Sequence, residues 1–165
     1  MKRWLTRLLL SIAVLGGALL LAGRLGLLAG SEPADLGVQG GRLKAPSTTP
    51  NSVSSQAALW VAHPRRTDAG IAPLPLRGDA ADAIARLQPL AAAMPGARVV
   101  RGSADYLYVQ CTSRWLGFVD DVEFWVDPAA GVIHVRSASR IGHGDRGVNR
   151  ARIEALRAAW MRPDS

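Results

Sequence analysis

The apolar positions of this chain form one long run near its start and several short periodic runs in its second half. Leu8–Gly23 contains no charged residue, and the apolar character resumes after Arg24. A helix over Leu8–Gly30 would be about 34 Å long at about 1.5 Å per residue, enough to cross a hydrocarbon layer about 30 Å thick. The pattern therefore predicts a transmembrane helix over residues 8–30, preceded by a basic N-terminus over residues 1–7.

The second half of the chain alternates between helical and strand periodicity. Asp79 can cap a helix whose apolar side chains recur at helical spacing as far as Met94, and a second helical stripe runs from about Asn149 to Met161. Four strand-like runs separated by short turns lie between them: Ala97–Arg101, Tyr106–Arg114, Phe118–Val126 and Val132–Ile141. This order predicts an α+β fold, a two-layer sandwich in which a four-stranded antiparallel meander carries two helices on one face.

Two segments between the apolar run and the first helix show no sustained period. Residues 31–49 are rich in Gly, Pro, Ser and Thr, which is typical of a flexible linker. The stretch that follows carries scattered apolar residues, and Pro73 and Pro75 favour extended backbone. It is therefore expected to wrap the domain as an extended arm, and the domain itself to cover residues 50–165.

The charge distribution indicates membrane topology rather than nucleic-acid binding. The formal net charge is +7, but residues 1–46 hold six basic residues against two acidic ones. Lys2, Arg3 and Arg7 precede the apolar run, so the positive-inside rule keeps the N-terminus in the cytoplasm and places the domain outside it, on a single-pass helix in the cytoplasmic (inner) membrane. A cleaved signal peptide is the alternative, although a cleavage site near Gly30 would have leucine at its −3 position.

The turn of the third predicted hairpin defines the register of its strands. Asp127–Gly131 has proline where a type I turn favours it and glycine where a positive φ is needed. Pairing Asp127 with Val132 places Glu123 opposite Arg136, whereas a shift by one residue would mix the apolar and polar faces. The face away from the helices then carries a polar row of Asp121, Glu123, Arg136 and Arg140.

Two interpretations of this polar row remain open. It can be a solvated ladder of ion pairs, each worth about 0–1 kcal/mol. It can also be a polar ligand site in which the arginines hold a carboxylate or a phosphate through paired hydrogen bonds. By alternation Asp120 points to the other side of the strand, near Ser139, or caps a neighbouring loop from a β-bulge.

The loop Gly142–Gly147 leads into the second helix and offers a further candidate. Its backbone N–H groups can hold an anion with help from Arg146 and Arg150, or Asp145 and Asn149 can cap the helix. Hydrogen bonds from Asn149 or Arg150 back to the acidic block of the third strand would make that block structural. The complete set of candidate ligand-binding residues is Asp121, Glu123, Arg136, Arg140, Arg146, Asn149 and Arg150.

Catalytic and metal-binding motifs find little support. Three serines lie near His63, namely Ser52, Ser54 and Ser55, but no Gly-x-Ser-x-Gly elbow frames them. The side chains that could ligate a metal are His63, His134, His143 and Cys111, and their spacing does not pre-arrange them. Cys111 is expected to be a small, partly buried apolar residue. We therefore predict no catalytic residue, no metal ligand and no cofactor.

Several segments together resemble the DUF1499 family, a widespread domain of unknown function. The segments that carry the resemblance are Pro50–Ser55, Ile71–Leu74, Gly117–Phe124, Ile133–Arg140 and Gly147–Arg150. The blocks FVDDVEF and VRSASR are the most specific of them, and the match spans residues 50–160. The resemblance implies a domain often found behind a membrane anchor or export signal, and it supplies no reaction. Family members typically read Asn-Cys-Val-Ser-Ser where this chain has Ser52.

These observations favour a membrane-anchored, non-catalytic envelope module that binds an envelope protein or an anionic ligand. The contacts expected for an anionic partner are Arg136, Arg140, Arg146 and Arg150. The alternative is an envelope enzyme of hydrolase type, in which Asp121 or Glu123 would serve as general acid or base. Nucleic acid is not an expected partner.

Overall fold

The computed structural model of the protein describes residues 2–162. Its helices are α1 (Lys2–Arg24), α2 (Ala80–Ala92) and α3 (Val148–Trp160), with one short 3-10 turn, η1 (Ala57–Leu59). Its strands are β1 (Ser52–Ser54), β2 (Leu74–Pro75), β3 (Ala97–Gly102), β4 (Tyr106–Thr112), β5 (Val119–Asp127) and β6 (Val132–Ser139). The expected α+β class is confirmed, and the four predicted strands end within two residues of their expected bounds.

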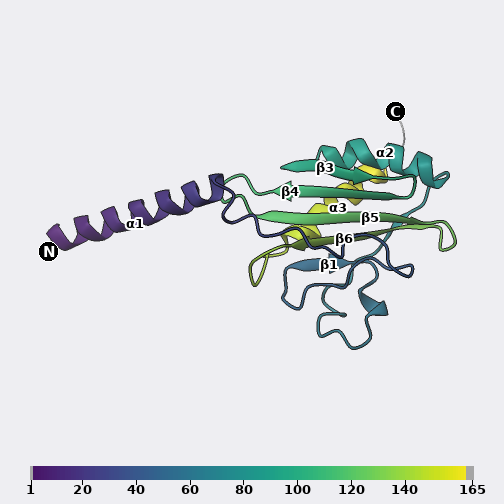
Figure 1. The fold of residues 1–165 in the computed structure, drawn as a ribbon, viewed down its shortest axis with the longest axis horizontal. Helices are drawn as coiled ribbons and strands as arrows, with labels where there is room; N and C mark the ends of the chain where they lie inside the picture. The colour runs from purple at the N-terminus through teal and green to yellow at the C-terminus, as the bar shows by residue number, and fades with distance from the viewer. Residues whose placement is uncertain (1, 163–165) are drawn as a thin grey trace.

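The strands form one antiparallel sheet in the order β1-β6-β5-β4-β3. β2 also pairs with β6, so the stretch expected to be an extended arm contributes two short strands to the sheet, which therefore has six strands rather than four. Figure 1 shows α2 and α3 together on one side of the sheet. The two-layer arrangement is thus the predicted one, and β1 and β2 extend the sheet beyond β6.

The hydrophobic core lies between the sheet and these two helices. Alternate residues of β4, β5 and β6 face it, and Leu87, Ile153 and Trp160 approach from the helices. The buried core side chains of the three strands are Leu107, Val109, Cys111, Val122, Phe124, Val126, Ile133 and Val135. Cys111 is a small buried residue, as expected, and burial raises the pKa of its thiol.

The β5–β6 hairpin has the register that its turn predicts. Asp127 pairs with Val132, Phe124 with Val135 and Glu123 with Arg136. Gly131 has φ of +65° at the turn, a conformation that glycine adopts without steric cost. Val122, Phe124 and Val126 of β5 and Ile133 and Val135 of β6 therefore face the helices, and the polar row faces the opposite way.

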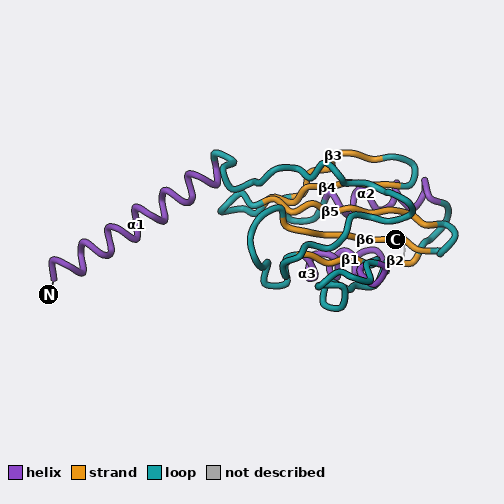
Figure 2. The backbone as a smooth tube through the Cα atoms, turned by 60° about the horizontal axis from the view of Figure 1, so that its bottom comes forward, coloured by secondary structure: helices purple, strands orange, loops and turns teal. Residues whose placement is uncertain are grey.

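α1 ends earlier than the apolar pattern suggests, at Arg24 rather than at Gly30. Gly26 has φ of +75°, Leu27 N donates to Ala22 O at 3.0 Å, and Gly26 N donates to Gly23 O at 3.1 Å. These bonds form a Schellman motif, which terminates the helix and satisfies its last carbonyl groups. The 23 residues of α1 still span about 34 Å. The helix is long and apolar enough to cross a membrane, and Figure 2 shows it projecting away from the rest of the molecule.

Candidate functional site

The polar row forms a network of charged and hydroxyl groups on the face of the sheet opposite the helices. Arg136 Nη1 donates to Glu123 Oε2 at 3.2 Å, directly across the β5–β6 pair. Arg140 reaches diagonally to Asp121, with Nε 3.0 Å from Oδ2 and Nη2 2.8 Å from Oδ1. All four predicted residues thus meet in space, and each arginine holds one carboxylate.

Two tyrosines of β4 complete this network, and the sequence analysis did not assign them to it. Tyr106 donates to Glu123 Oε1 at 2.8 Å and Tyr108 donates to Asp121 Oδ1 at 2.5 Å. Burial and the bond to Asp121 raise the pKa of Tyr108 to about 12, and burial together with the charge of Glu123 raises the pKa of Tyr106. Both tyrosines therefore remain protonated donors. Alternation along β4 places residues 106, 108 and 110 on one face, but the register of β4 against β5 is what brings the two tyrosines to the carboxylates.

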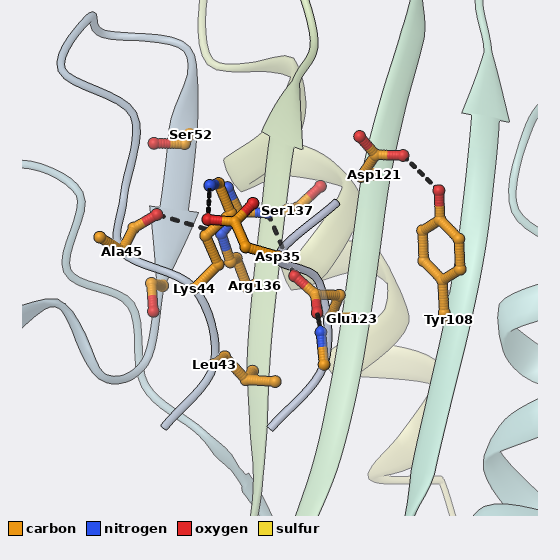
Figure 3. A network of polar contacts seen from close by, with 12 residues as sticks. Asp35, Leu43, Lys44, Ala45, Ser52, Tyr108, Asp121, Glu123, Arg136 and Ser137 are labelled. Carbon is orange, nitrogen blue, oxygen red and sulfur yellow. Dashed lines mark hydrogen bonds and ion pairs between the residues drawn. The ribbon is translucent and has the colours of Figure 1, made fainter. Parts of the chain in front are cut away.

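The network is sealed by the segment that the sequence indicates as a flexible linker. Gly37 N donates to Glu123 Oε1 at 2.7 Å, and Arg136 Nε donates to the carbonyl oxygen of Ala45 at 3.3 Å. Leu43 is buried and its N–H donates to Gln56 Oε1 at 2.8 Å. Figure 1 shows this segment crossing β5 and β6, and Figure 3 shows it over Arg136 and Glu123. The expectation of a free linker over residues 31–49 is therefore corrected: its backbone polar groups bind the charged row.

The burial of these side chains bears on the interpretation of the row as a solvated ladder. Glu123 is 0% exposed, Asp121 1% and Arg136 3%, so the row is not a solvated ladder. In this structure the carboxylates pair with the arginines, the tyrosines and the N–H of Gly37 in the covering segment. Buried charges of this kind are stable only when they are paired and hydrogen-bonded. In this structure Glu123 and Arg136 bind the chain's own Gly37 and Ala45.

Asp120 belongs to a second polar cluster on the helix side of the sheet. Arg152 of α3 donates to Asp120 Oδ2 at 2.6 Å. We expected Asn149 or Arg150 to bind the acidic block, but Asp120 is bound by Arg152. Asn149 is completely buried, and its amide nitrogen donates to Asn51 O at 3.0 Å and to Ser139 Oγ at 3.1 Å. Arg152 lies outside the apolar stripe of α3, so helical periodicity alone assigns it to solvent and does not predict this ion pair.

The loop before α3 is a capping structure. Asp145 accepts hydrogen bonds from Gly147 N at 2.9 Å and from Asn149 N at 2.8 Å. Burial would raise the pKa of Asp145, but these N–H donors outweigh burial and hold the pKa below its ordinary value. Arg150 donates to the carbonyl oxygens of Asp68 and Gly70 at 2.9 and 2.8 Å. The side chain of Asp145 thus occupies two of the backbone donors at the start of α3, and Arg150 joins α3 to the segment before β2.

Ser55 contacts His134 rather than His63. Its Oγ lies 3.1 Å from His134 Nδ1 and accepts the N–H of Val135 at 2.9 Å, while His134 Nε2 is 3.7 Å from Asp127 Oδ2. Burial lowers the pKa of His134, against the opposing effect of Asp127. The serine hydroxyl thereby joins the residue after β1 to β6. Within residues 2–162 the structure brings together no group of three His, Cys, Asp or Glu side chains suited to a metal ion.

An apolar groove of about 610 Å³ lies between α2 and α3, on the outer face of the helical layer. Three alanines of α3 at successive turns, Ala151, Ala155 and Ala159, line it. Leu90 and Met94 line it from the α2 side. Of its described lining residues only Arg152 and Arg162 are charged, and Arg152 is paired with Asp120. The groove is therefore an apolar surface that remains open on the domain.

The fold and these sites define a class of protein: an α+β domain with a closed polar network, preceded by a helix apolar enough to span a membrane. A family model described as "Protein of unknown function (DUF1499)" matches residues 42–160. The chain belongs to this family, which confirms the resemblance seen in the sequence. The match begins at Arg42, inside the segment that covers the polar row. No curated protein and no solved structure matches the chain.

Proposed function

We propose that this protein is a single-pass envelope module that works by binding a partner, with α1 retained as its anchor and its domain on the outer side of the cytoplasmic membrane. The observation that carries the proposal is the closed polar network. Glu123 and Arg136, which are suited to acid–base catalysis or to anion binding, instead bind the segment that connects α1 to the domain. An enzyme using Asp121 or Glu123 has less support, because both carboxylates are buried and paired.

The contacts of the connecting segment also favour an anchor over a cleaved signal peptide. Gly23, still inside α1, is buried against the turn between β4 and β5. Arg140 Nη1 lies 3.5 Å from the carbonyl oxygen of Gly30. A cleaved peptide would have no need of a packed joint with the domain. Lys2, Arg3 and Arg7 lie in the first two turns of α1, at the end away from the domain, and favour an outward-facing domain.

The binding surface that we propose is the groove between α2 and α3, and the partner is an apolar segment of a second envelope protein. Small side chains along α3 allow a partner's backbone to approach closely, and Val148 and Met161 extend the apolar strip to both ends of the helix. α3 ends on the side of the domain away from α1 (Figure 1), and Arg162, two residues beyond that end, lines the groove. A cation there suits an acidic group of a protein partner better than a lipid headgroup. Arg146, which is exposed, remains outside this surface.

The first prediction concerns topology. Alkaline phosphatase fused after Ser165 should be active, and a cytoplasmic reporter at the same joint inactive, because the basic residues at the N-terminal end of α1 do not cross the bilayer readily. The full-length fusion protein, without proteolytic shortening, should also stay in the membrane fraction after alkaline carbonate extraction. Inactive phosphatase beside an active cytoplasmic reporter would refute the orientation, and a shortened, extractable product would refute the anchor.

The second prediction concerns the groove. A benzophenone amino acid in place of Ala155 should form a covalent adduct of defined mass with an envelope protein in living cells. The variant A151R should abolish that adduct, because its side chain fills the groove one turn away. The same crosslinker at Ala129, exposed in the β5–β6 turn, is the matched control. An adduct with lipid alone, or one that persists in A151R, contradicts a protein partner at this site.

A further inference from the structure

α1 and the β4–β5 turn are in direct backbone contact through two glycines. A Cβ placed on Gly23 would lie 2.6 Å from the carbonyl oxygen of Leu116, and one placed on Gly117 would lie 2.5 Å from the carbonyl oxygen of Gly23. Real Cβ atoms do not approach so closely, so only glycine fits at either position. The turn is thereby held next to the last turn of α1, one residue before Arg24.

Three large apolar side chains are exposed at this junction. Trp115 is 67% exposed at the tip of the β4–β5 turn, and Leu25 and Leu27, in the turns after α1, are 66% and 72% exposed. Such exposure is unfavourable in water and favourable at the boundary between headgroups and acyl chains. The Schellman motif satisfies the backbone groups around Leu25 and Leu27, which a surrounding of low polarity requires.

The charges of the junction are of one sign. Arg24 ends α1, and the guanidinium of Arg114 lies over the Trp115 ring, 5.1 Å from its centroid. Residues 24–31 and 113–118 contain no acidic residue. Arginine beside an interfacial aromatic ring is the combination that suits a membrane surface with anionic lipids, because the ring enters the interface and the cation meets the phosphate groups.

We propose that Leu25, Leu27, Trp115, Arg24 and Arg114 form an interfacial patch that inserts into the outer surface of the bilayer in which α1 is anchored. The proposal rests on the anchoring proposed above and deepens it. The patch binds anionic headgroups and thereby fixes the orientation of the domain relative to the membrane surface. The Gly23–Leu116 contact sets the depth of Trp115, because Arg24 marks the point at which the helix leaves the hydrocarbon layer.

The test uses the full chain labelled with 5-fluorotryptophan in nanodiscs of phosphatidylcholine and phosphatidylglycerol, observed by ¹⁹F NMR. Lipids that carry gadolinium on the headgroup broaden nearby resonances. The variant W115F assigns the Trp115 resonance. We expect this resonance to broaden to the same extent as that of Trp4, which lies near the other end of α1. Trp125 and Trp160, within the domain, should keep their resonances. Nanodiscs of phosphatidylcholine alone should weaken the broadening of Trp115 and leave that of Trp4 unchanged.

Two matched helix variants test the cause. G23V adds a side chain that clashes with Leu116 and should restore the Trp115 resonance, whereas G17V, whose Cβ has nothing within 4 Å, should leave the broadening as it was. If Trp4 broadens and Trp115 does not, the chain is anchored but the patch is not interfacial, and the inference is wrong. If neither broadens, the anchor itself fails. Equal broadening of Trp115 in G23V and G17V would show that the glycine contact does not set its depth.

Discussion

Replacing Arg136 with methionine is expected to lower the free energy of unfolding by about 3–5 kcal/mol, because Glu123 then remains as a buried charge without its counter-ion. Glu123 is completely buried, and Arg136 Nη1 is 3.2 Å from its carboxylate. The same variant removes the hydrogen bond to Ala45, so the covering segment should loosen as well. Urea denaturation of the full chain in detergent micelles, followed by near-ultraviolet circular dichroism, measures the loss.

The same substitution at an exposed ion pair is the control. Arg65 pairs with Asp68 at 2.9 Å near the surface, and R65M should cost no more than about 1 kcal/mol. The double variant E123Q/R136M should be more stable than R136M, because a neutral amide needs no counter-ion and its oxygen still accepts from Gly37 and Tyr106. A loss in R136M no larger than that in R65M would show that the row is solvated.

Replacing Asn149 with alanine is expected to lower the free energy of unfolding by about 2–3 kcal/mol, because buried groups lose their hydrogen-bond partner. The amide of Asn149 donates to Asn51 O, and its carbonyl oxygen accepts from Ser137 Oγ at 2.5 Å and from Arg152 Nη1 at 2.7 Å. The variant should also accelerate hydrogen exchange of Ser139 N–H, which donates to Asn51 O. Denaturation and exchange on the same sample separate a local from a global effect.

Val148 provides the comparison for Asn149. It is exposed and adjacent on the same turn of α3, so V148A should change the stability by no more than about 0.5 kcal/mol. If N149A and V148A lose the same small amount, then Asn149 does not hold α3 to β6 and to the segment before β1. The exchange rate of Ser139 N–H should then also be unaffected.

Both polar clusters join parts of the chain that are far apart in sequence. The row on β5 and β6 binds Gly37 and Ala45, and Asn149 binds Asn51. The first two bonds attach the segment after α1 to the sheet, and the third attaches α3 to the residue before β1.

The parts of the site that depend on one hairpin were predictable. The pairing of Glu123 with Arg136 follows from a five-residue turn and from strict alternation, because a slip of one residue would bury polar side chains in the core. The contact of Arg140 with Asp121 follows from the same register, since diagonal neighbours lie within reach of a long side chain. The hairpin alone does not determine whether these pairs are exposed to solvent.

The covering segment and the partner of Asp120 were not predictable in this way. Residues 31–49 have the composition of a linker, and their main contacts are made by backbone groups, which are the same in every sequence. Arg152 lies on the flank of α3 that periodicity assigns to solvent, yet the helix sits close enough to β5 for its guanidinium to reach Asp120. Both results depend on how segments about 30 to 90 residues apart pack.

The sequence by itself determined the apolar helix, the order of helices and strands, the hairpin register and the family, because each depends on local periodicity, turn chemistry or a contiguous motif. Only the tertiary structure decided that the charged row is closed, that Tyr106 and Tyr108 complete it, and that α1 packs on the β4–β5 turn. The physical reason is that burial depends on which distant segment comes to lie over a face. The periodicity of a strand identifies its two faces, but it contains no information about what covers them.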